Sequence, residues 1–306
     1  MRIIVIGAQG QVGWELTRRA AVLGHAVLAW DQAELDITDA AAVDRALDAS
    51  GAAVAINAAA YTAVDKAEQE PELAFAVNRD GPAHLAAACA RSSIPLLHIS
   101  TDYVFDGRKT DPYTEDDPVA PLGVYGRSKQ EGDEAVRGLL SRHFILRVSW
   151  VFGAHGHNFV KTILRLARER EELRVVADQH GCPTYAGDIA DVLLELAGRL
   201  AEIDARDSWG TYHYCGAPAT TWHGFASAIV EQARIREPLE VRAVTPIHTI
   251  DYPTPAARPA NSVLDSSRLM ERFGIGPRPW WDGLEAMLAV VSPLTPNPSP
   301  AGGRGE

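Results

Sequence analysis

The stretch RIIVIGAQGQVG, residues 2–13, decides the fold. Its apolar, β-branched run over residues 2–6 predicts a buried strand that ends at Gly7. The glycines at positions 7, 10 and 13 form the pattern G-x-x-G-x-x-G, and apolar residues at helical spacing begin at Val12. Glycines at such a bend let the backbone approach a pyrophosphate, and the helix N-terminus directs free N–H groups at its negative charge. The stretch therefore predicts a dinucleotide-binding turn between a first strand and a first helix.

Strands and helices alternate in the residues that follow. Apolar runs predict three further strands, AVLAW at 26–30, AVAI at 53–56 and IPLLHIS at 94–100. Residues 39–49 predict a helix capped by Thr38 or Asp39, and residues 71–92 predict one long helix. Such alternation is typical of a parallel sheet covered by helices on both faces. We therefore predict an α/β fold, a Rossmann-type doubly wound parallel sheet with a smaller C-terminal substrate-binding lobe.

The regular alternation ends after the apolar stretch HFILRVSWVFG. We therefore predict a dinucleotide-binding Rossmann domain over residues 1–154. Residues 155–292 are predicted to form mainly the substrate-binding lobe, with chain crossings back to the sheet. Residues 293–306 are rich in Pro and Gly and poor in apolar side chains, so we expect a disordered tail.

Composition limits the partners of this chain. It has 306 residues and a net charge of −11, which argues against binding to nucleic acid or to an anionic membrane surface. No apolar run reaches the roughly 20 residues that a membrane-spanning helix needs. Cys89, Cys182 and Cys215 are far apart and odd in number, which disfavours a disulfide framework or a zinc site and fits a reducing cytoplasm. We therefore expect a cytoplasmic protein that binds a small molecule, without nucleic-acid or membrane partners.

Further motifs point to a nicotinamide dinucleotide. Asp31 ends the second strand, where an acid can bond a ribose hydroxyl. The glycine spacing resembles that of the extended short-chain dehydrogenases/reductases, in which the counterparts of Asp36 and Ile37 contact adenine and the counterpart of the loop 57–61 lies along the cofactor. NADPH or NADH is the implied cofactor. The implied cofactor contacts are Gly7, Gly10, Gln11, Val12, Gly13, Asp31, Asp36, Ile37, Ala59, Ala60, Tyr61, Tyr125 and Lys129.

Two segments, STDYVFDG at 100–107 and VYGRSK at 124–129, carry the candidate chemistry. Tyr125 and Lys129 are four residues apart, so a helix places them on one face. A neighbouring ammonium favours the phenolate, so we expect Lys129 to lower the pKa of Tyr125 from about 10 and to suit it to proton transfer. Thr101 offers a hydroxyl to hold a substrate oxygen. The predicted catalytic set, Thr101, Tyr125 and Lys129, fits reduction of a carbonyl by a nicotinamide cofactor.

A closer resemblance covers about residues 1–292. The motifs NAAAYTAVDKAE, STDYVFDG, PLGVYGRSK, DQHGCPT and ARPANSVLD run in register with those of the dTDP-4-dehydrorhamnose reductases. The resemblance implies reduction of the 4-keto group of dTDP-4-dehydro-L-rhamnose to dTDP-L-rhamnose for surface polysaccharides. It implies stacking of Trp150 on a sugar ring, unless Trp150 is only core, and a diphosphate contact for Arg258, whose alternative is a surface ion pair. The implied substrate contacts are Thr101, Asp102, Trp150, Asn158, Arg258 and Asn261.

Two other functions stay open at this point. A nucleotide-sugar dehydratase or epimerase could share the fold, but related dehydratases carry Thr-Asp-Glu where this chain has Thr101, Asp102 and Tyr103, which favours simple reduction. A non-catalytic regulatory subunit is the second alternative, since the β subunit of methionine adenosyltransferase resembles the same family. The presence of Tyr125 and Lys129 favours an enzyme. The nucleotide on the sugar and the preference between NADPH and NADH also stay open.

Some members of the resembled family dimerise through Mg²⁺ held by glutamates. Glu15 matches one such glutamate, and Asp188 falls near the second but is one methylene shorter. The late stretch MLAVVSPL has no carboxylate, and Glu285 lies about one helical turn too early for the third ligand. We therefore expect no bound metal, and a monomer or a homodimer.

Overall fold

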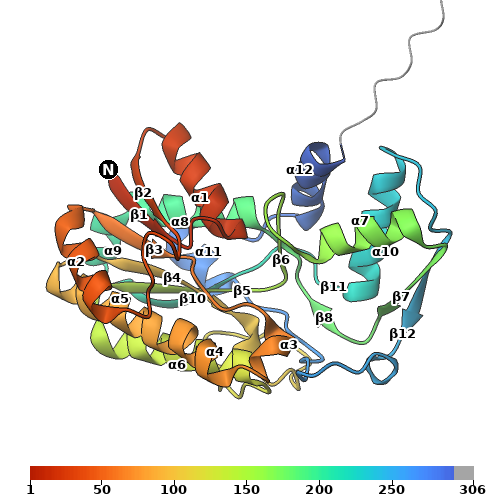
Figure 1. The fold of residues 1–306 in the computed structure, drawn as a ribbon, viewed down its shortest axis with the longest axis horizontal. Coiled ribbons are helices and arrows are strands. Elements are labelled where there is room, and N and C mark those ends of the chain that lie inside the picture. The colour runs from red at the N-terminus through yellow and green to blue at the C-terminus, as the bar shows by residue number, and fades with distance from the viewer. Residues whose placement is uncertain (293–306) are drawn as a thin grey trace, which may run out of the picture.

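Six parallel strands form the central sheet of the computed structural model, which describes residues 1–292 (Figure 1). The strands are β1 (Arg2–Ile6), β2 (Ala26–Trp30), β3 (Val54–Asn57), β4 (Leu96–Thr101), β5 (His143–Val148) and β10 (Gly210–Tyr214). The predicted strands at 2–6, 26–30, 53–56 and 94–100 correspond to β1 to β4. The predicted disordered tail, 293–306, lies outside the described residues.

The order of strands across the sheet is β10-β5-β4-β3-β1-β2. β1 pairs with β2 on one side and with β3 on the other, so the chain winds in opposite directions from this point. In open parallel sheets of this kind, ligands bind outside the carboxyl ends of the strands where the winding reverses. The topology therefore places the expected site beside Gly7, at the carboxyl end of β1.

Helices cover both faces of the sheet, because side chains of successive strand residues point to opposite faces. In β1, Ile3 and Val5 join one apolar cluster, whereas Ile4 and Ile6 join another, and all four are buried. The first cluster is covered by α1 (Gln11–Val22), α8 (Ala186–Gly198) and α11 (Ser267–Phe273), and the second by α2 (Ala40–Ser50), α5 (Gly81–Arg91) and α6 (Val124–Leu139). The predicted Rossmann-type fold is confirmed.

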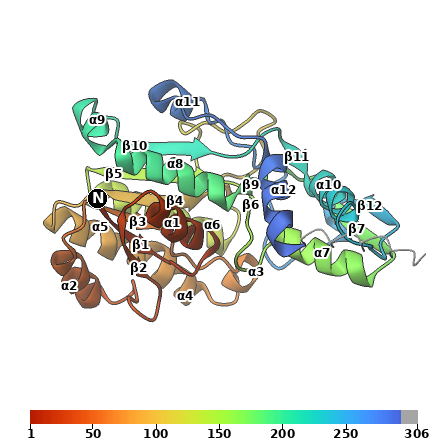
Figure 2. The same ribbon diagram turned by 90° about the horizontal axis from the view of Figure 1, so that it is seen from above.

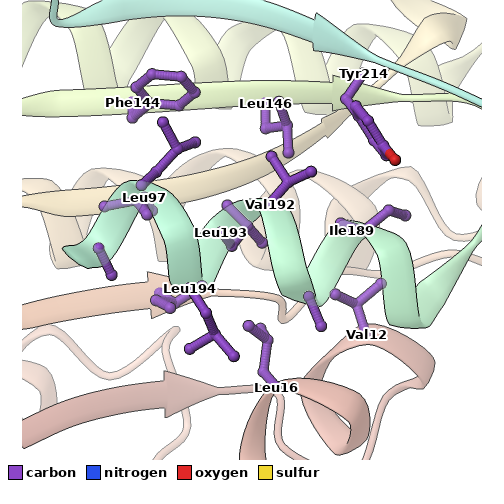
Figure 3. Close-up of a cluster of buried hydrophobic side chains, with 14 of the residues drawn as sticks. Val12, Leu16, Leu97, Phe144, Leu146, Ile189, Val192, Leu193, Leu194 and Tyr214 are labelled. Atoms are coloured by element: carbon purple, nitrogen blue, oxygen red, sulfur yellow. The ribbon is translucent and has the colours of Figure 1, made fainter. Parts of the chain in front are cut away.

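Three elements that cover or extend the sheet, α8, β10 and α11, come from late in the chain. Figure 3 shows the apolar side chains of α8, among them Ile189 and Val192, gathered with Leu146 of β5 and with Val12 and Leu16 of α1. β10 pairs with β5 at the edge of the sheet, and α11 lies beside β10 (Figure 2). The chain thus returns to the sheet from α8 to β10 and again at α11, and the segments before, between and after these returns build a second lobe.

The second lobe has an apolar core of its own. Its helices are α7 (Phe159–Glu169), α10 (Trp222–Arg234) and α12 (Trp280–Val291), and its paired parallel strands are β7 (Glu172–Val176) and β12 (Ala243–Ile247). Short strands run between the two lobes, namely β6 (Val151–Phe152), β8 (His180–Gly181), β9 (Thr184–Tyr185) and β11 (Thr220–Thr221). In Figure 1 the lobe stands beside the carboxyl ends of the sheet. The remaining short helices are α3 (Val64–Ala67), α4 (Pro71–Phe75) and α9 (Leu200–Ala205).

The long helix predicted over residues 71–92 is interrupted. α4 passes into a π-helical turn at Ala76–Asp80 before α5 begins at Gly81. The turn carries the buried Asn78, whose amide bonds both the N–H and the carbonyl of Tyr61 at 2.8 and 3.0 Å. A wide turn of this kind often marks a functional segment. Here it fixes the loop that leads from β3 along the expected cofactor site.

Among residues 1–292, no helix combines the length and the apolar character needed to cross a bilayer.

Candidate active site

Two adjoining cavities lie at the carboxyl ends of the strands. The smaller, of about 300 Å³, opens beside Gly7, and the larger, of about 540 Å³, opens at the end of β4. Gly10, Ala58 and Ala60 line both, so the two spaces meet at the glycine turn. The strand ends, α6 and the second lobe together form the walls of this continuous cleft.

The glycine turn has the shape that a pyrophosphate needs. Gly7 has a φ of +77°, and a side chain there would meet Ala59 N at 2.5 Å. A Cβ on Gly13 would lie 2.0 Å from the Gly7 carbonyl oxygen, so only glycine lets α1 pack this closely on β1. Gly10 is the N-cap of α1 and no side chain caps the helix, which leaves its first N–H groups free for an anion. These positions fit a bound dinucleotide.

The smaller cavity collects most of the predicted cofactor contacts. Its lining includes Gly7, Gly10, Asp31, Asp36, Ile37, Ala59, Ala60 and Tyr61. Asp36 is already engaged, because its carboxylate accepts hydrogen bonds from the N–H and the hydroxyl of Thr38 at 2.9 and 2.7 Å. Asp31 directly follows β2, and its side chain lies at the lining of the smaller cavity. The other predicted cofactor residues, Gln11, Val12, Tyr125 and Lys129, line the larger cavity, and Gly13 packs behind the turn.

The larger cavity brings together residues from both lobes. Thr101 and Asp102 come from the end of β4, Tyr125 and Lys129 from α6, and Trp150 from the loop after β5. Asn158 caps α7, where its Oδ1 accepts the Lys161 N–H at 3.1 Å, and its amide donates to Gln11 Oε1 at 3.0 Å. Residues that are distant in the sequence, and that the motifs singled out, thus line one cavity.

Burial determines the protonation of Tyr125. Burial raises the pKa of Tyr125 to about 12, Asp102 and Asp133 act in the same direction, and only the hydrogen bond with Thr101 opposes them. The expected lowering by Lys129 is wrong for this structure, because the Lys129 ammonium is itself buried and donates to the Ile99 carbonyl at 2.7 Å. A protonated phenol is the form that can deliver a proton to a carbonyl oxygen.

Asp102 follows Thr101 and is held by two hydroxyl groups. Its carboxylate accepts hydrogen bonds from Thr101 Oγ1 at 2.9 Å and from Ser149 Oγ at 3.1 Å. Burial raises the pKa of Asp102 to about 6, although hydrogen bonds from Thr101, Ser262 and Ser149 oppose the shift. Asp102 is the only carboxylate that lines the larger cavity among residues 1–292. The cavity therefore lacks the second acid that the Thr-Asp-Glu arrangement would supply.

Trp150 is held in an unusual backbone conformation. Its φ is +46°, in the left-handed region that bulky residues rarely adopt. Its indole stacks on that of Trp222, with ring centroids 3.5 Å apart, and its Nε1–H donates to the Ser262 hydroxyl at 3.1 Å. The absence of a side chain at Gly181 makes room for the indole, since a Cβ there would lie 2.3 Å from it. Strained residues fixed in this way cluster at functional sites, and here the paired indoles form an aromatic wall of the cavity.

Sequence reasoning missed two aromatic residues of the site. Trp222 begins α10 directly after the capping Thr221, and Tyr103 packs edge-on against Tyr125 with ring centroids 5.6 Å apart. Both line the larger cavity. One sequence signal could have identified Trp222. It directly follows Thr220 and Thr221 at the start of a helix, where a bulky aromatic residue has no capping role. His157, which also lines the cavity, carried no such signal.

Comparison with known proteins agrees with this geometry. The family model described as the RmlD substrate binding domain matches residues 1–292. A dTDP-4-dehydrorhamnose reductase of Aggregatibacter actinomycetemcomitans is 47% identical over 292 residues, which cover 95% of this chain and 99% of that protein. The chain belongs to the dTDP-4-dehydrorhamnose reductase family.

Solved structures of dTDP-4-dehydrorhamnose reductases have the same fold. The enzyme of Clostridium acetobutylicum superimposes with a TM-score of 0.87 at 37% identity and covers 95% of this chain and 99% of its own. The enzyme of Bacillus anthracis, solved in complex with NADP, gives a TM-score of 0.87 at 36% identity, covering 94% of this chain and 98% of its own. The resemblance to dTDP-4-dehydrorhamnose reductases is confirmed over residues 1–292.

Two residues implied by the likeness to dTDP-4-dehydrorhamnose reductases lie outside the cavity linings. Arg258 pairs with Asp65 at 2.8 Å and donates to the Ala256 carbonyl at 2.9 Å. This is the ion pair that was the alternative to a diphosphate contact. Asn261 donates to the carbonyls of Lys109 and Asp111 and accepts the Val263 N–H. Its amide is thereby fully used in holding a loop, so the structure does not bring it to the site.

The carboxylates that some dTDP-4-dehydrorhamnose reductases use for Mg²⁺ are neutralised by arginines in this chain. We call Glu15, Arg19, Asp188, Asp191 and Arg278 the outer cluster. Arg19 bonds Glu15 at 2.9 Å and Asp191 at 2.8 Å, and Arg278 bonds Asp188 at 2.8 Å and Asp191 at 2.9 Å. A hard cation needs open oxygen ligands, whereas here guanidinium groups occupy the oxygens. The outer cluster therefore does not fit a metal site.

Proposed function

We propose that this chain reduces the 4-keto group of dTDP-4-dehydro-L-rhamnose to dTDP-L-rhamnose with NADPH or NADH. The carrying observation is that Thr101, Tyr125 and Lys129 share one cavity that joins the glycine turn. The product would supply rhamnose for surface polysaccharides. We place the reaction in the cytoplasm, and we propose a monomer or a homodimer as the working form.

In this proposal the protein supplies geometry and a proton. Bound NADPH or NADH supplies the hydride for C4 of the sugar. Tyr125, kept protonated by burial, gives its phenolic proton to the oxygen that develops negative charge. Thr101, whose hydroxyl bonds Asp102, lies at the strand end where it can hold the same oxygen. Lys129 presents an ammonium to the cofactor ribose and so orients the nicotinamide.

The remaining cavity residues are assigned to the sugar and the cofactor. Asp102 offers acceptors to sugar hydroxyls, and the indoles of Trp150 and Trp222 offer an apolar wall to the ring. Asn158 ties α7 to Gln11 at the glycine turn, so it supports both ligands from the second lobe. We infer that residues 1–154 chiefly bind the cofactor and residues 155–292 chiefly bind the sugar, with α8 and β10 as structural returns to the sheet.

Two observations favour reduction over the alternatives. A dehydratase needs a second acid or base beside the threonine, and Tyr103 stands there instead of a carboxylate. A regulatory subunit would need no partly buried phenol and buried ammonium on α6 in the cavity that joins the glycine turn. Burying such groups costs stability, and their presence favours a catalytic use.

The decisive experiment is a defined incubation. The purified chain is mixed with dTDP-4-dehydro-L-rhamnose and either NADPH or NADH, cofactor oxidation is followed by absorbance, and the sugar product is identified by NMR. We expect one dTDP-L-rhamnose for each cofactor oxidised. Cofactor binding without oxidation would indicate a regulatory subunit, and an isomerised sugar without cofactor consumption would indicate an epimerase.

A further inference from the structure

A buried group of charged and polar residues lies directly behind the catalytic lysine. We call Lys129, His98, Asp133 and Arg147 the lysine cluster. Their exposed fractions are 2%, 0%, 0% and 3%, so water does not stabilise their charges. His98 comes from β4, Arg147 from β5 and the other two from α6. None of these three neighbours of Lys129 lines the cavity.

The carboxylate of Asp133 accepts two hydrogen bonds and is the anion nearest to both Arg147 and Lys129 in the cluster. Its Oδ2 accepts hydrogen bonds from Ser100 Oγ at 2.9 Å and from Arg147 Nε at 3.3 Å. Its Oδ1 has no hydrogen-bond partner among residues 1–292 and lies 3.8 Å from His98 Nε2. The Lys129 ammonium lies 3.4 Å from the same nitrogen. One carboxylate therefore stands against two buried positive charges, with an imidazole between it and Lys129.

The hydrogen bonds around His98 fix its tautomer. Asn57 Oδ1 accepts the Ala59 N–H at 3.0 Å, so Asn57 Nδ2 is the donor to His98 Nδ1, also at 3.0 Å. A neutral imidazole that accepts at Nδ1 carries its proton on Nε2. Burial lowers the pKa of His98, and the charge of Lys129 lowers it further, so the ring stays neutral. His98 therefore cannot accept a proton from the ammonium, and it supplies no negative charge.

The charge of Lys129 consequently depends on Asp133. Burial lowers the pKa of Lys129 to about 8, and the carboxylate of Asp133 acts against that shift. The other ionisable groups that face the cluster are Tyr125 and Arg137 on α6, Asp102 after β4, His143 on β5 and Glu115. Asp102 raises the pKa of Tyr125, Glu115 acts on Arg147, and Arg137 and His143 add positive charge or none. Asp133 is the negative group of the cluster that favours the ammonium.

We propose that Asp133 is a positioning residue for the reduction. Its carboxylate, oriented by Ser100 and Arg147, lies on the far side of His98 from Lys129 and keeps the ammonium protonated at neutral pH. The kinetic test of this inference rests on the proposed function, because it measures reduction of the proposed sugar. Asp133 touches neither cavity, so it acts on turnover through its neighbours. These are Lys129 and, because the charge of Asp133 also raises the pKa of Tyr125, the phenol; NADPH affinity reports on Lys129 alone. Activity is present below the pKa of Lys129 and is lost as pH rises through it. Removing the carboxylate lowers that pKa and moves the loss to lower pH.

The test compares Asp133→Asn with Arg147→Gln. Both changes break the same buried ion pair, but only the first removes the negative charge. We expect Asp133→Asn to shift the alkaline limb of kcat/KM down by about 1 pH unit or more, the usual effect of one nearby charge. We expect Arg147→Gln not to lower it. Asp133→Glu, which keeps the charge, should restore the limb towards that of the wild type.

NADPH affinity gives a second readout that needs no sugar. If the pKa of Lys129 falls from about 8 to about 7, its protonated fraction at about pH 7.5 falls from about three quarters to about one quarter. We therefore expect Asp133→Asn to bind NADPH roughly threefold more weakly at about pH 7.5 and as well as wild type at about pH 6. Cofactor fluorescence measures both values. A wrong choice of sugar substrate would abolish turnover in every variant but leave this comparison intact.

Two outcomes overturn the proposal, and a double variant covers the case in which Asp133→Asn does not fold. A folded Asp133→Asn chain whose alkaline limb and NADPH affinity match the wild type overturns it. Equal downward shifts in Asp133→Asn and Arg147→Gln also overturn it, because they would show that the ion pair, not the charge, matters. If Asp133→Asn does not fold, the double change with Arg147→Gln removes both charges together, which proteins tolerate better. A smaller shift of the limb, still towards lower pH, is then expected, and an unshifted limb overturns the proposal.

Discussion

The lysine cluster and the outer cluster both pair cations with carboxylates. In the first, burial outweighs the pairing in setting the pKa of the cations, and in the second the pairing outweighs burial. In the lysine cluster, two cations share Asp133, and burial lowers the pKa of both Lys129 and Arg147 against the pull of that carboxylate. In the outer cluster, burial acts in the same direction on Arg19 and Arg278, but the paired carboxylates outweigh it and raise both pKa values. One cluster holds a cation near the pH at which it loses its proton, and the other holds cations that never do.

This difference separates a functional group of charges from a structural one. Charges buried without full pairing reduce stability, so their presence at a cavity indicates use. Charges neutralised by several partners stabilise the packing of α1 on α8, and the arginines compete with any cation for the carboxylates. The predictions below test this division, from the change expected to cost most to the one expected to cost nothing.

Tyr125→Phe should cause the largest loss. The change keeps the ring but removes the proton donor of the cleft, so turnover should fall by a factor on the order of 10²–10⁴. NADPH affinity should change little. Tyr103→Phe is the matched control, because it removes a partly buried phenol that packs edge-on against Tyr125, and it should cost far less. Steady-state kinetics on both variants check this, and a Tyr125→Phe enzyme with more than half of wild-type turnover would refute the assignment.

Asp31→Ala should change the choice of cofactor. A carboxylate at the ribose favours NADH by its hydrogen bond and repels the 2′-phosphate of NADPH. Losing a charge-assisted hydrogen bond should move the ratio of kcat/KM values towards NADPH by roughly tenfold or more. Asp36→Asn is the control, since Thr38 already binds that carboxylate, and its ratio should move less. An unchanged ratio in Asp31→Ala would mean that Asp31 does not touch the ribose.

Trp222→Ala should raise the KM for the sugar. The change removes one indole of the aromatic wall, and the lost apolar contact of about 1.5–3 kcal/mol predicts an increase on the order of tenfold or more. The cofactor KM should stay near the wild-type value. Trp281→Ala is the control, because that partly exposed indole on α12 lines neither cavity. Equal sugar KM values in the two variants would contradict a sugar contact at Trp222.

Chelation should have no effect. Because guanidinium groups occupy the carboxylates of the outer cluster, we expect EDTA to change neither turnover nor the molecular mass measured by light scattering. Asp188→Asn extends the comparison, since it should leave the alkaline limb of kcat/KM in place while Asp133→Asn moves it. Dissociation on chelation, reversed by added Mg²⁺, would show that the outer cluster binds metal after all.

Local patterns predicted most of the first half of the fold. The glycine turn, the shared helix face of Tyr125 and Lys129, and a cap of α2 at Thr38 or Asp39 all follow from spacings of a few residues. The structure shows that Asp39 is the cap. Long-range pairings were not predictable in this way. Nothing in GTYHY indicates that β10 returns to β5, and nothing near Arg258 indicates its partner Asp65.

The protonation states of the site were the hardest part to predict. From the sequence, Lys129 next to Tyr125 suggested a lowered pKa for the phenol. In the folded chain, burial of both side chains outweighs their proximity, so the pKa of Tyr125 rises and that of Lys129 falls. Asp133 counters the effect of burial on the pKa of Lys129. It lies one helical turn further along α6, and His98 of β4 lies between the two side chains. Such an arrangement becomes visible only when β4 and α6 are packed together.

The central claim is that the cleft transfers a hydride to C4 of the sugar and a proton to its oxygen. The most direct measurement uses NADPH or NADH carrying deuterium at the transferring position of the nicotinamide, with dTDP-4-dehydro-L-rhamnose in ordinary water. NMR and mass spectrometry then locate the label in the product. We predict one deuterium at C4 of dTDP-L-rhamnose from one of the two cofactor epimers and none at other carbons. A product without deuterium at C4, or with label at another ring carbon, would contradict the account.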